Sequence, residues 1–141
     1  MPVSVGIRRS YYVILRERSD MNKKNANEIS TASLAYLGDA VLELLVREKL
    51  ILDGEGDIHE RALRYVTAVA QSEAFDRISA SLTDDEMSVY KRGRNNTHSA
   101  PKSATHAQYS RATGFECLFA YLHLSGENER IKELFTLAFP D

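Results

Sequence analysis

Two acidic side chains stand within stretches of the chain that are otherwise apolar, and they are the first candidates for chemistry. Asp39 and Glu116 each have leucine, valine or phenylalanine neighbours at helical spacing. An unpaired carboxylate in such a position is costly, so each acid needs a compensating cation. A hard divalent cation such as Mg²⁺ takes oxygen ligands from carboxylates, waters and phosphates. Spacing alone leaves two interpretations open: a shared metal site, or separate salt bridges to arginines such as Arg47 or Arg111.

Gly38 directly precedes the first of these acids. Glycine within a helix costs about 1 kcal/mol relative to alanine, so its presence needs a physical reason. Because glycine has no Cβ, it lets another group approach the backbone closely. We therefore expect a bulky neighbour to lie against Gly38.

Other catalytic chemistries have less support. The single cysteine, Cys117, excludes an intramolecular disulfide and a cysteine-rich zinc site, and its apolar neighbours predict a buried side chain. The histidines show neither metal-ligand spacing nor a nucleophile pattern; they are His59, His98, His106 and His123. A helical phosphohydrolase acting on nucleotides is a rival interpretation, although such enzymes generally use several His-Asp pairs.

A basic segment interrupts a chain whose formal net charge is −2. A polyanion would have to bind a local surface of this kind, because the average charge of the chain is unfavourable. Duplex RNA is recognised through its phosphates and 2′-hydroxyls, which suits cationic and amide donors. The predicted RNA-binding residues are Lys91, Arg92, Arg94, Asn95 and Lys102. The alternative is a solvated, charged loop without a partner.

The element that must position Asp39 is a helix from Ser30 or Thr31 to about Leu50. Ser30 and Thr31 are good N-cap residues, and apolar residues follow at helical spacing. Apolar residues also occupy the opposite side of this helix. A helix that is apolar on both sides belongs in the middle of a bundle or against a partner subunit.

The remaining chain predicts further helices and no strand, which makes the fold class all-α. Asp57 caps a helical stretch over residues 58–81, with a kink allowed within it, and Thr83 with Glu86 forms a capping box for a short helix that ends near Gly93. Residues 91–105, rich in Gly, Asn, Ser, Thr and Pro, predict the longest loop. Residues 105–124, which carry Glu116, and a segment around 131–138 complete the set.

Composition places the chain among globular proteins. It has 141 residues, of which 43% are hydrophobic and 27% charged, as expected for one domain with an ordinary core. We expect a loosely ordered N-terminal extension over residues 1–29 and a catalytic domain over 30–141. No apolar run reaches the roughly 18 to 20 residues of a membrane span, and the start lacks a secretion signal. A cytoplasmic protein is the expectation.

The two acidic stretches resemble a known family. Residues 36–44, around Asp39, resemble the signature helix of the ribonuclease III family, and residues 115–122, around Glu116, resemble its second acidic motif. The order and spacing of the motifs agree with the family, and the likeness covers residues 30–138. It implies a ribonuclease III-like helical domain in which Asp39 and Glu116 are catalytic metal ligands. The implied cofactor is Mg²⁺, with Mn²⁺ as a substitute.

A closer resemblance is to the Mini-ribonuclease III branch, which consists of the catalytic domain alone. It is carried by residues 91–95, by Pro101 with Lys102, and by residues 108–116. The chain ends at Asp141, so we expect no double-stranded-RNA-binding domain. The resemblance implies a homodimer that cleaves double-stranded RNA and matures the stem of the large-subunit (23S) ribosomal RNA precursor.

The chain departs from the full ribonuclease III pattern at two positions where further acids are usual. Ala35 stands four residues before Asp39, and Thr113 stands three residues before Glu116. The reduction predicts weaker or more water-mediated metal binding, with Glu43 as a candidate supporting acid. The alternative is a catalytically silent RNA-binding or ribosome-assembly module with the same fold.

Overall fold

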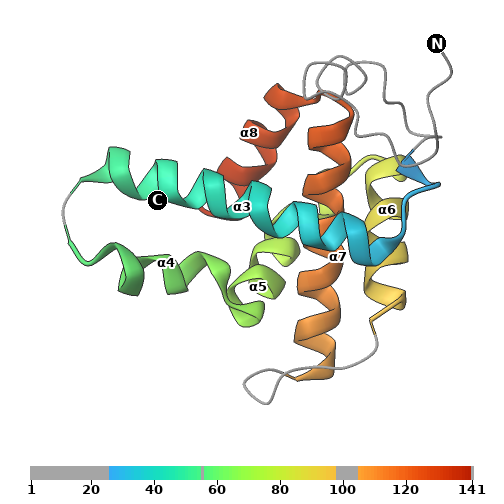
Figure 1. The fold of residues 1–141 in the computed structure, drawn as a ribbon, viewed down its shortest axis with the longest axis horizontal. Coiled ribbons are helices and arrows are strands. Elements are labelled where there is room, and N and C mark those ends of the chain that lie inside the picture. The colour runs from blue at the N-terminus through green and yellow to red at the C-terminus, as the bar shows by residue number, and fades with distance from the viewer. Residues whose placement is uncertain (1–25, 55, 98–104, 141) are drawn as a thin grey trace, which may run out of the picture.

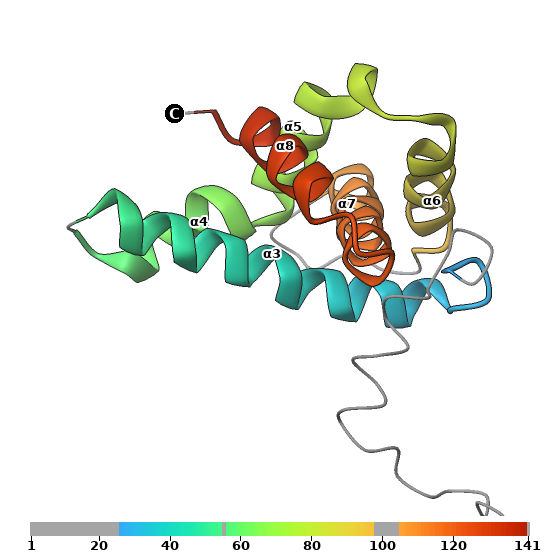
Figure 2. The ribbon, with the colours of Figure 1, turned by 90° about the horizontal axis from the view of Figure 1, so that it is seen from above.

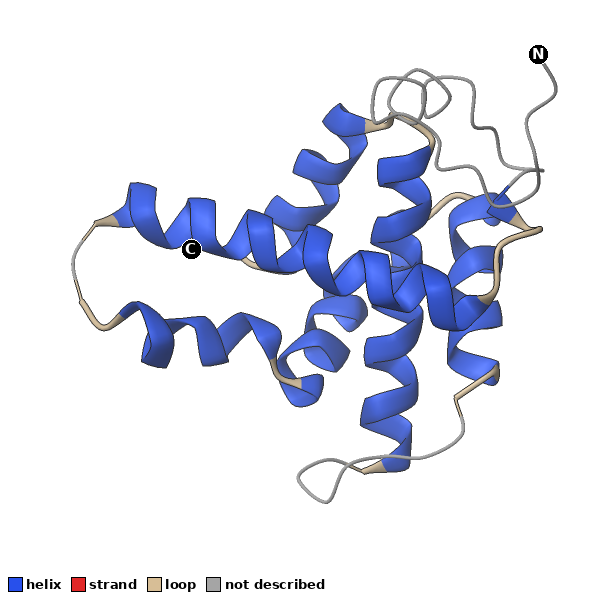
Figure 3. Cartoon of the chain, in the orientation of Figure 1, coloured by secondary structure: helices blue, strands red, loops and turns tan. Residues whose placement is uncertain are grey.

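A computed structural model describes residues 26–54, 56–97 and 105–140, and these ranges fold into helices without any strand. Figures 1 and 3 show their arrangement. The elements are α3 (Thr31–Asp53), α4 (Ile58–Val66), α5 (Ala68–Ile78), the 3-10 turn η1 (Ser79–Ser81), α6 (Asp84–Asn95), α7 (His106–Leu124) and α8 (Asn128–Ala138). The predicted all-α fold class is confirmed.

Helix α7 lies at the centre of the molecule, with α3 crossing it and α5, α6 and α8 around it (Figures 1 and 2). Its side chains are buried on every side over the middle of the helix, including Phe115, Leu118 and Phe119, which are completely covered. A helix that is apolar all round needs such a position. Cys117 is buried in the same core, as predicted.

Helix α3 has one buried and one exposed apolar side. The buried side packs mainly against α7 and consists of Leu34, Gly38, Val41, Leu42, Val46 and Leu50. On the other side Tyr36 is 85% exposed and Leu52 is 84% exposed, and Leu44 and Ile51 are exposed with them. The two sides differ from the sequence-based assignment, because Leu42 and Val46, expected opposite Leu34 and Val41, are buried with them, whereas Leu44 is exposed. An apolar side of α3 is therefore uncovered in the single chain.

The caps that bound these helices are largely those expected from the sequence. Ser30 accepts a hydrogen bond from the Ser33 amide, Asp57 accepts from the His59 and Glu60 amides, and Thr83 with Glu86 forms the capping box. Thr67 caps α5 with an extended backbone, which explains why residues 58–81 form two helices and a turn. The kink that the sequence allowed within residues 58–81 is a complete break between α4 and α5.

The prediction that residues 91–105 form one long loop is wrong at its beginning. Helix α6 continues to Asn95, so the basic residues from Lys91 to Asn95 are helical. Close packing explains the difference, because a Cβ at Gly93 would lie 2.8 Å from Cys117 Sγ, so the last turn of α6 lies directly on α7. Residues 98–104, with His98 and the predicted RNA-binding Lys102, lie outside the described residues.

The predicted N-terminal extension falls mostly outside the described residues. The described part begins at Ala26, which is fully buried in the core, four residues before the expected start of the domain. None of the described helices is both long enough and apolar enough to cross a membrane.

Candidate metal centre

A pocket of about 560 Å³ opens where α3, the end of α6 and α7 meet. Its lining contains both acids that the sequence singled out. The residues around it are Thr31, Ala32, Ala35, Tyr36, Asp39, Asn96, Thr97, Tyr109, Thr113 and Glu116. The crossing of α3 over α7 thus brings together two carboxylates that are 77 positions apart in the chain.

Gly38 makes this crossing possible. A Cβ built on Gly38 would lie 1.8 Å from the backbone oxygen of Glu116, far inside contact distance. The bulky neighbour expected at Gly38 is therefore the backbone of α7 at Glu116 itself. Because Asp39 follows Gly38, the same close contact that joins the two helices places the two acids in one pocket.

Both carboxyl groups have raised pKa values. Burial, followed by the negative charge of Asp39, raises the pKa of Glu116 to about 8. Burial, followed by the charge of Glu43, raises the pKa of Asp39 above its ordinary range. A carboxylate next to another carboxylate is destabilised, and a bound cation would relieve this. The electrostatics of the pocket favour a cation.

The structure argues against separate salt bridges for the two acids. Arg47 pairs with Glu43 at 2.7 Å, and Arg111 lies 3.6 Å from Asp76. Among the described residues, neither Asp39 nor Glu116 forms an ion pair with an arginine or lysine. Although its sequence neighbours are apolar, the Asp39 side chain faces the open pocket and is exposed, whereas Glu116 is partly buried.

The protein supplies few charged ligands here. Within the ranges described, no group of three or more His, Cys, Asp and Glu side chains is placed to hold a metal ion. Ala35 and Thr113, where further acids were noted as missing, line the same pocket with a methyl group and a hydroxyl group. Two carboxylates in an open pocket fit a Mg²⁺ ion that keeps several waters, since Mg²⁺ dehydrates reluctantly.

Several polar pocket residues were not among the predicted site residues, namely Tyr36, Asn96, Thr97, Tyr109 and Thr113. Helical spacing in the sequence could have indicated that some of these residues share a helix face with the two acids. Tyr109, Thr113 and Glu116 follow the period of one helix face, as do Ala32, Ala35 and Asp39. Asn96 and Thr97 carried no comparable signal, because their place depends on how the end of α6 packs against α7.

Four of the five predicted RNA-binding residues, all except Lys102, lie on the last turns of α6. Lys91 and Asn95 are exposed, and the Arg94 guanidinium lies over the Tyr90 ring at 5.7 Å while its Nε donates to Asn95 Oδ1 at 3.1 Å. This turn leads directly into Asn96 and Thr97 at the rim of the pocket. Lys91, Arg94 and Asn95 therefore lie on the helix that leads to the pocket, while the pocket lining itself takes only Asn96 and Thr97 from this part of the chain.

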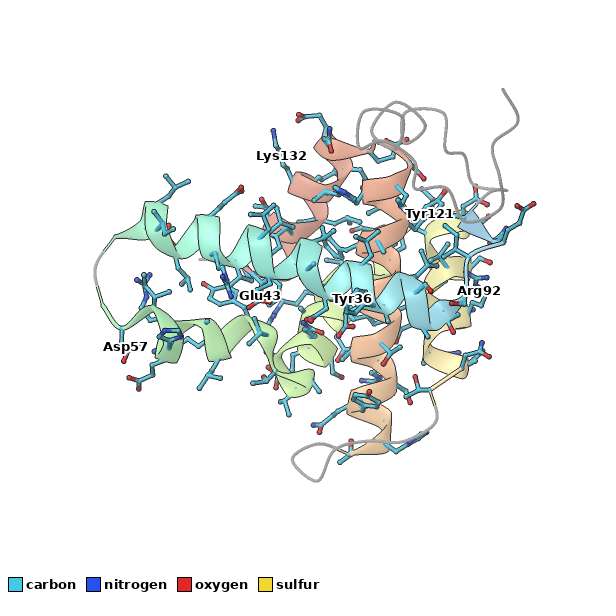
Figure 4. The ribbon with its side chains drawn as sticks, in the orientation of Figure 1. Tyr36, Glu43, Asp57, Arg92, Tyr121 and Lys132 are labelled. Carbon is cyan, nitrogen blue, oxygen red and sulfur yellow. The ribbon has the colours of Figure 1, made fainter. Side chains whose placement is uncertain are left out.

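Arg92 differs from its neighbours. Its guanidinium donates to the backbone oxygens of Asn27 at 2.8 Å, Ala26 at 3.3 Å and Ile29 at 3.0 Å. Figure 4 shows this side chain beside the N-terminal end of α3, away from the stretch of α3 that carries Tyr36 and Glu43. Arg92 fastens the segment before α3 to α6, a structural role that sequence reasoning did not foresee.

Comparison with known proteins identifies relatives for most of this fold. Residues 32–127 match the model of the ribonuclease III domain. A Mini-ribonuclease 3 from Symbiobacterium thermophilum is 44% identical over 122 residues, covering 84% of this chain and 94% of the relative. A Mini-ribonuclease 3 from Thermoanaerobacter sp. is 36% identical over 122 residues, covering 84% and 86%. A crystal structure of a Fusobacterium nucleatum protein superposes with a TM-score of 0.74 at 27% identity, covering 79% of this chain and 94% of that one.

Proposed function

This chain belongs to the ribonuclease III family, and on that basis we propose that it is a metal-dependent endoribonuclease that cleaves double-stranded RNA. The observation that carries the proposal is the shared pocket of Asp39 and Glu116, two acids from crossed helices without a basic partner among the described residues. Helix α6, which carries Lys91 and Arg94 near its end, is followed directly by Asn96 and Thr97 in the lining of the same pocket.

Asp39 and Glu116 would be the protein ligands of the cation, for which we propose Mg²⁺ with Mn²⁺ as a substitute. When bound, such a cation lowers the pKa of a water nucleophile and neutralises charge on the phosphodiester. Glu116 must lose its proton for this role, and its pKa of about 8 means that proton release accompanies metal binding. Glu43 lies one turn from Asp39 and is ion-paired with Arg47, which suits an indirect, supporting role.

Lys91, Arg94 and Asn95, together with Lys102, would contact the RNA backbone. The three cations of this set concentrate positive charge locally in a chain whose net charge is −2, and would attract the RNA phosphates, while Asn95 would donate hydrogen bonds to them. Arg92, also proposed from the sequence, already donates both of its terminal nitrogens to backbone oxygens. Its contribution to RNA binding would therefore be to hold α6 in place.

A twofold homodimer would join the exposed apolar sides of two α3 helices. Tyr36, Leu44, Ile51 and Leu52 leave a surface that water does not favour, on the same helix as Asp39. Because a duplex has local twofold symmetry, two symmetry-related sites would each cut one strand. The likeness to the Mini-ribonuclease 3 relatives is the only support for the finer proposals, that the substrate is the stem of precursor 23S ribosomal RNA and that the protein acts in the cytoplasm.

The test is incubation of the purified protein with end-labelled duplex RNA, in Mg²⁺ and in excess chelator. The expected result is cleavage of both duplex strands in Mg²⁺ only, with single-stranded RNA and duplex DNA of the same sequence left intact. Loss of cleavage in chelator separates metal-dependent hydrolysis from a contaminating metal-independent nuclease.

The second candidate is a silent RNA-binding or ribosome-assembly module. The observation that favours it is the pocket itself, where Ala35 and Thr113 replace acids and only two carboxylates are left. Duplex RNA that is bound by the protein but left intact at every Mg²⁺ concentration would establish this function and reject the proposed one.

A further inference from the structure

Two threonines in the pocket have their hydroxyl hydrogens already committed. Thr113 Oγ1 donates to the backbone oxygen of Tyr109 at 3.0 Å, and Thr97 Oγ1 donates to the backbone oxygen of Gly93 at 3.2 Å. A carbonyl oxygen cannot donate, so the direction of both hydrogen bonds is fixed. Each hydroxyl has a single hydrogen, and each oxygen can therefore only accept a further hydrogen bond.

The two threonine oxygens add to the acceptors of a pocket whose side-chain donors are the hydroxyls of Thr31, Tyr36 and Tyr109 and the second amide hydrogen of Asn96. When ionised, Asp39 and Glu116 are acceptors only, and the two threonine oxygens add neutral acceptors to them. Asn96, at the same rim, donates one amide hydrogen to the Arg92 backbone oxygen at 2.7 Å, and its carbonyl oxygen adds a further acceptor. A phosphate group would need donors in these positions. The waters of a hydrated cation, in contrast, are donors and need acceptors.

The acceptors also come from different walls of the pocket. Asp39 belongs to α3, Thr113 and Glu116 belong to α7, and Thr97 follows the end of α6. Water occupies roughly 30 Å³ per molecule in the liquid, so the pocket volume of about 560 Å³ has room for a cation with a complete shell of waters. Mg²⁺ usually keeps such waters when few carboxylates are available.

We propose that Thr97 and Thr113 are positioning residues that accept hydrogen bonds from the water shell of the cation held by Asp39 and Glu116. Hydrogen bonds between the protein and these waters would then supply much of the binding free energy of the metal. The proposal rests on the proposed function, because it assumes the same metal site. It goes further by giving a role to neutral side chains where acids are missing, one of them at the position of an absent acid.

The test uses a cation whose ligands do not exchange. Cobalt(III) hexaammine presents a shell of N–H donors and cannot bind a carboxylate directly, so it reports outer-shell binding alone. Calorimetric titration of the full chain should give one pocket-dependent site for cobalt(III) hexaammine, and Mg²⁺ should compete for it. The Thr97→Val and Thr113→Val variants should each weaken binding of both cations by roughly three- to tenfold, the value of one lost hydrogen bond.

The chain offers matched controls. Thr136 on α8 is exposed and donates to the Lys132 backbone oxygen at 2.8 Å, so Thr136→Val makes the same chemical change away from the pocket and should leave both affinities unchanged. Thr97→Ser and Thr113→Ser keep the hydroxyl and should restore most of the affinity. If a valine variant folds poorly by circular dichroism, binding of cobalt(III) hexaammine to the parent protein, in competition with Mg²⁺, remains as the test.

The outcomes separate this proposal from the proposed function. If cobalt(III) hexaammine does not bind the pocket, or if both valine variants bind Mg²⁺ and cobalt(III) hexaammine as tightly as the parent, the role of the threonines is overturned. Loss of Mg²⁺ binding in Asp39→Asn would still support the metal site in that case. If Asp39→Asn binds Mg²⁺ as tightly as the parent, the metal assignment of the proposed function fails.

Discussion

Glu116 is the side chain whose ionisation is most strongly disfavoured by the environment of this site. Burial and the charge of Asp39 act in the same direction and raise its pKa to about 8, against an ordinary value of 4.5. Without a bound cation, between pH 4.5 and about pH 8, the folded protein therefore keeps a proton on Glu116 that the unfolded chain has released. Folding, protonation and metal binding are linked at this one side chain.

The first prediction follows from this linkage. Above pH 4.5 and below about pH 8, the folded state holds more protons at Glu116 than the unfolded state. The free energy of unfolding should therefore fall as pH rises through this range, and the loss should be complete above the folded pKa. Glu116→Gln removes the effect. In chelator at about pH 9, we expect this variant to be more stable than the parent by roughly 4 kcal/mol, and at about pH 5 nearly equal to it.

Urea unfolding followed by circular dichroism measures both differences. Mg²⁺ added at the higher pH should stabilise the parent and leave Glu116→Gln almost unaffected. A Glu116→Gln variant that is less stable than the parent at the higher pH would contradict the assigned environment of Glu116.

Among the elements, the crossing of α3 and α7 has the strictest geometric requirement. Gly38 is the point of contact, since its missing Cβ would lie 1.8 Å from the backbone oxygen of Glu116. Backbone atoms cannot move aside as a flexible side chain would. Any larger residue at Gly38 must separate the two helices, and with them the two acids.

The second prediction is that Gly38→Ala destabilises the protein by about 3 kcal/mol or more, because the added methyl group overpacks the crossing. Helix propensity predicts the opposite sign, a gain of about 1 kcal/mol. Thermal or urea unfolding decides between them. Ala40→Gly, at an exposed position of the same helix, is the control and should cost only about 1 kcal/mol through propensity. A stabilised Gly38→Ala protein would refute the close crossing.

The elements also show how far the sequence could be used to predict this fold. Caps and periodicity are local signals, and they were sufficient for the start of α3, the capping box of α6 and the all-α fold class. The end of α6 was missed because Gly93 and its polar neighbours are typical of a loop. Its helical state depends on contact with Cys117 on α7, which no local pattern contains.

The same distinction applies to the candidate site. Asp39 and Glu116 could be proposed from the sequence because carboxylates are conspicuous among apolar residues. The role of Arg92 could not, because an arginine that binds RNA and one that binds backbone oxygens of residues 26–29 are the same in sequence. Likewise, the placement of Thr97 in the pocket follows from tertiary packing alone.

At the scale of the whole molecule, the outer side of α3 exposes apolar side chains to solvent in the single chain. Figures 1 and 2 show its C-terminal half extending with α4 away from the rest of the molecule. Exposed apolar side chains lie on this pair, Leu44, Ile51 and Leu52 on α3 and Ile58 and Leu63 on α4. Large apolar side chains exposed on two neighbouring helices are what an association site would require.

The third prediction concerns this surface. The parent protein should have a solution mass twice that of the 15.9 kDa chain, and the double variant Leu44→Glu/Leu52→Glu should have the mass of one chain, because charges would be buried without partners at the interface. Light scattering after size-exclusion chromatography measures both masses. Leu137→Glu on α8, at another exposed apolar position, should keep the parental mass. A monomeric parent that still cuts both strands of a duplex would exclude the paired-site arrangement.

The most direct measurement of the central claim, a metal-dependent nuclease site built from Asp39 and Glu116, is single-turnover cleavage of duplex RNA by Asp39→Asn. The substitution is nearly isosteric and removes one charged ligand, so the cleavage rate at saturating RNA should fall by about 100-fold or more, with RNA affinity and the circular dichroism spectrum unchanged. Glu48→Gln removes an equal charge at an exposed position of the same helix, outside the pocket lining, and should retain most of the rate. An Asp39→Asn protein that cleaves as fast as the parent would contradict the account.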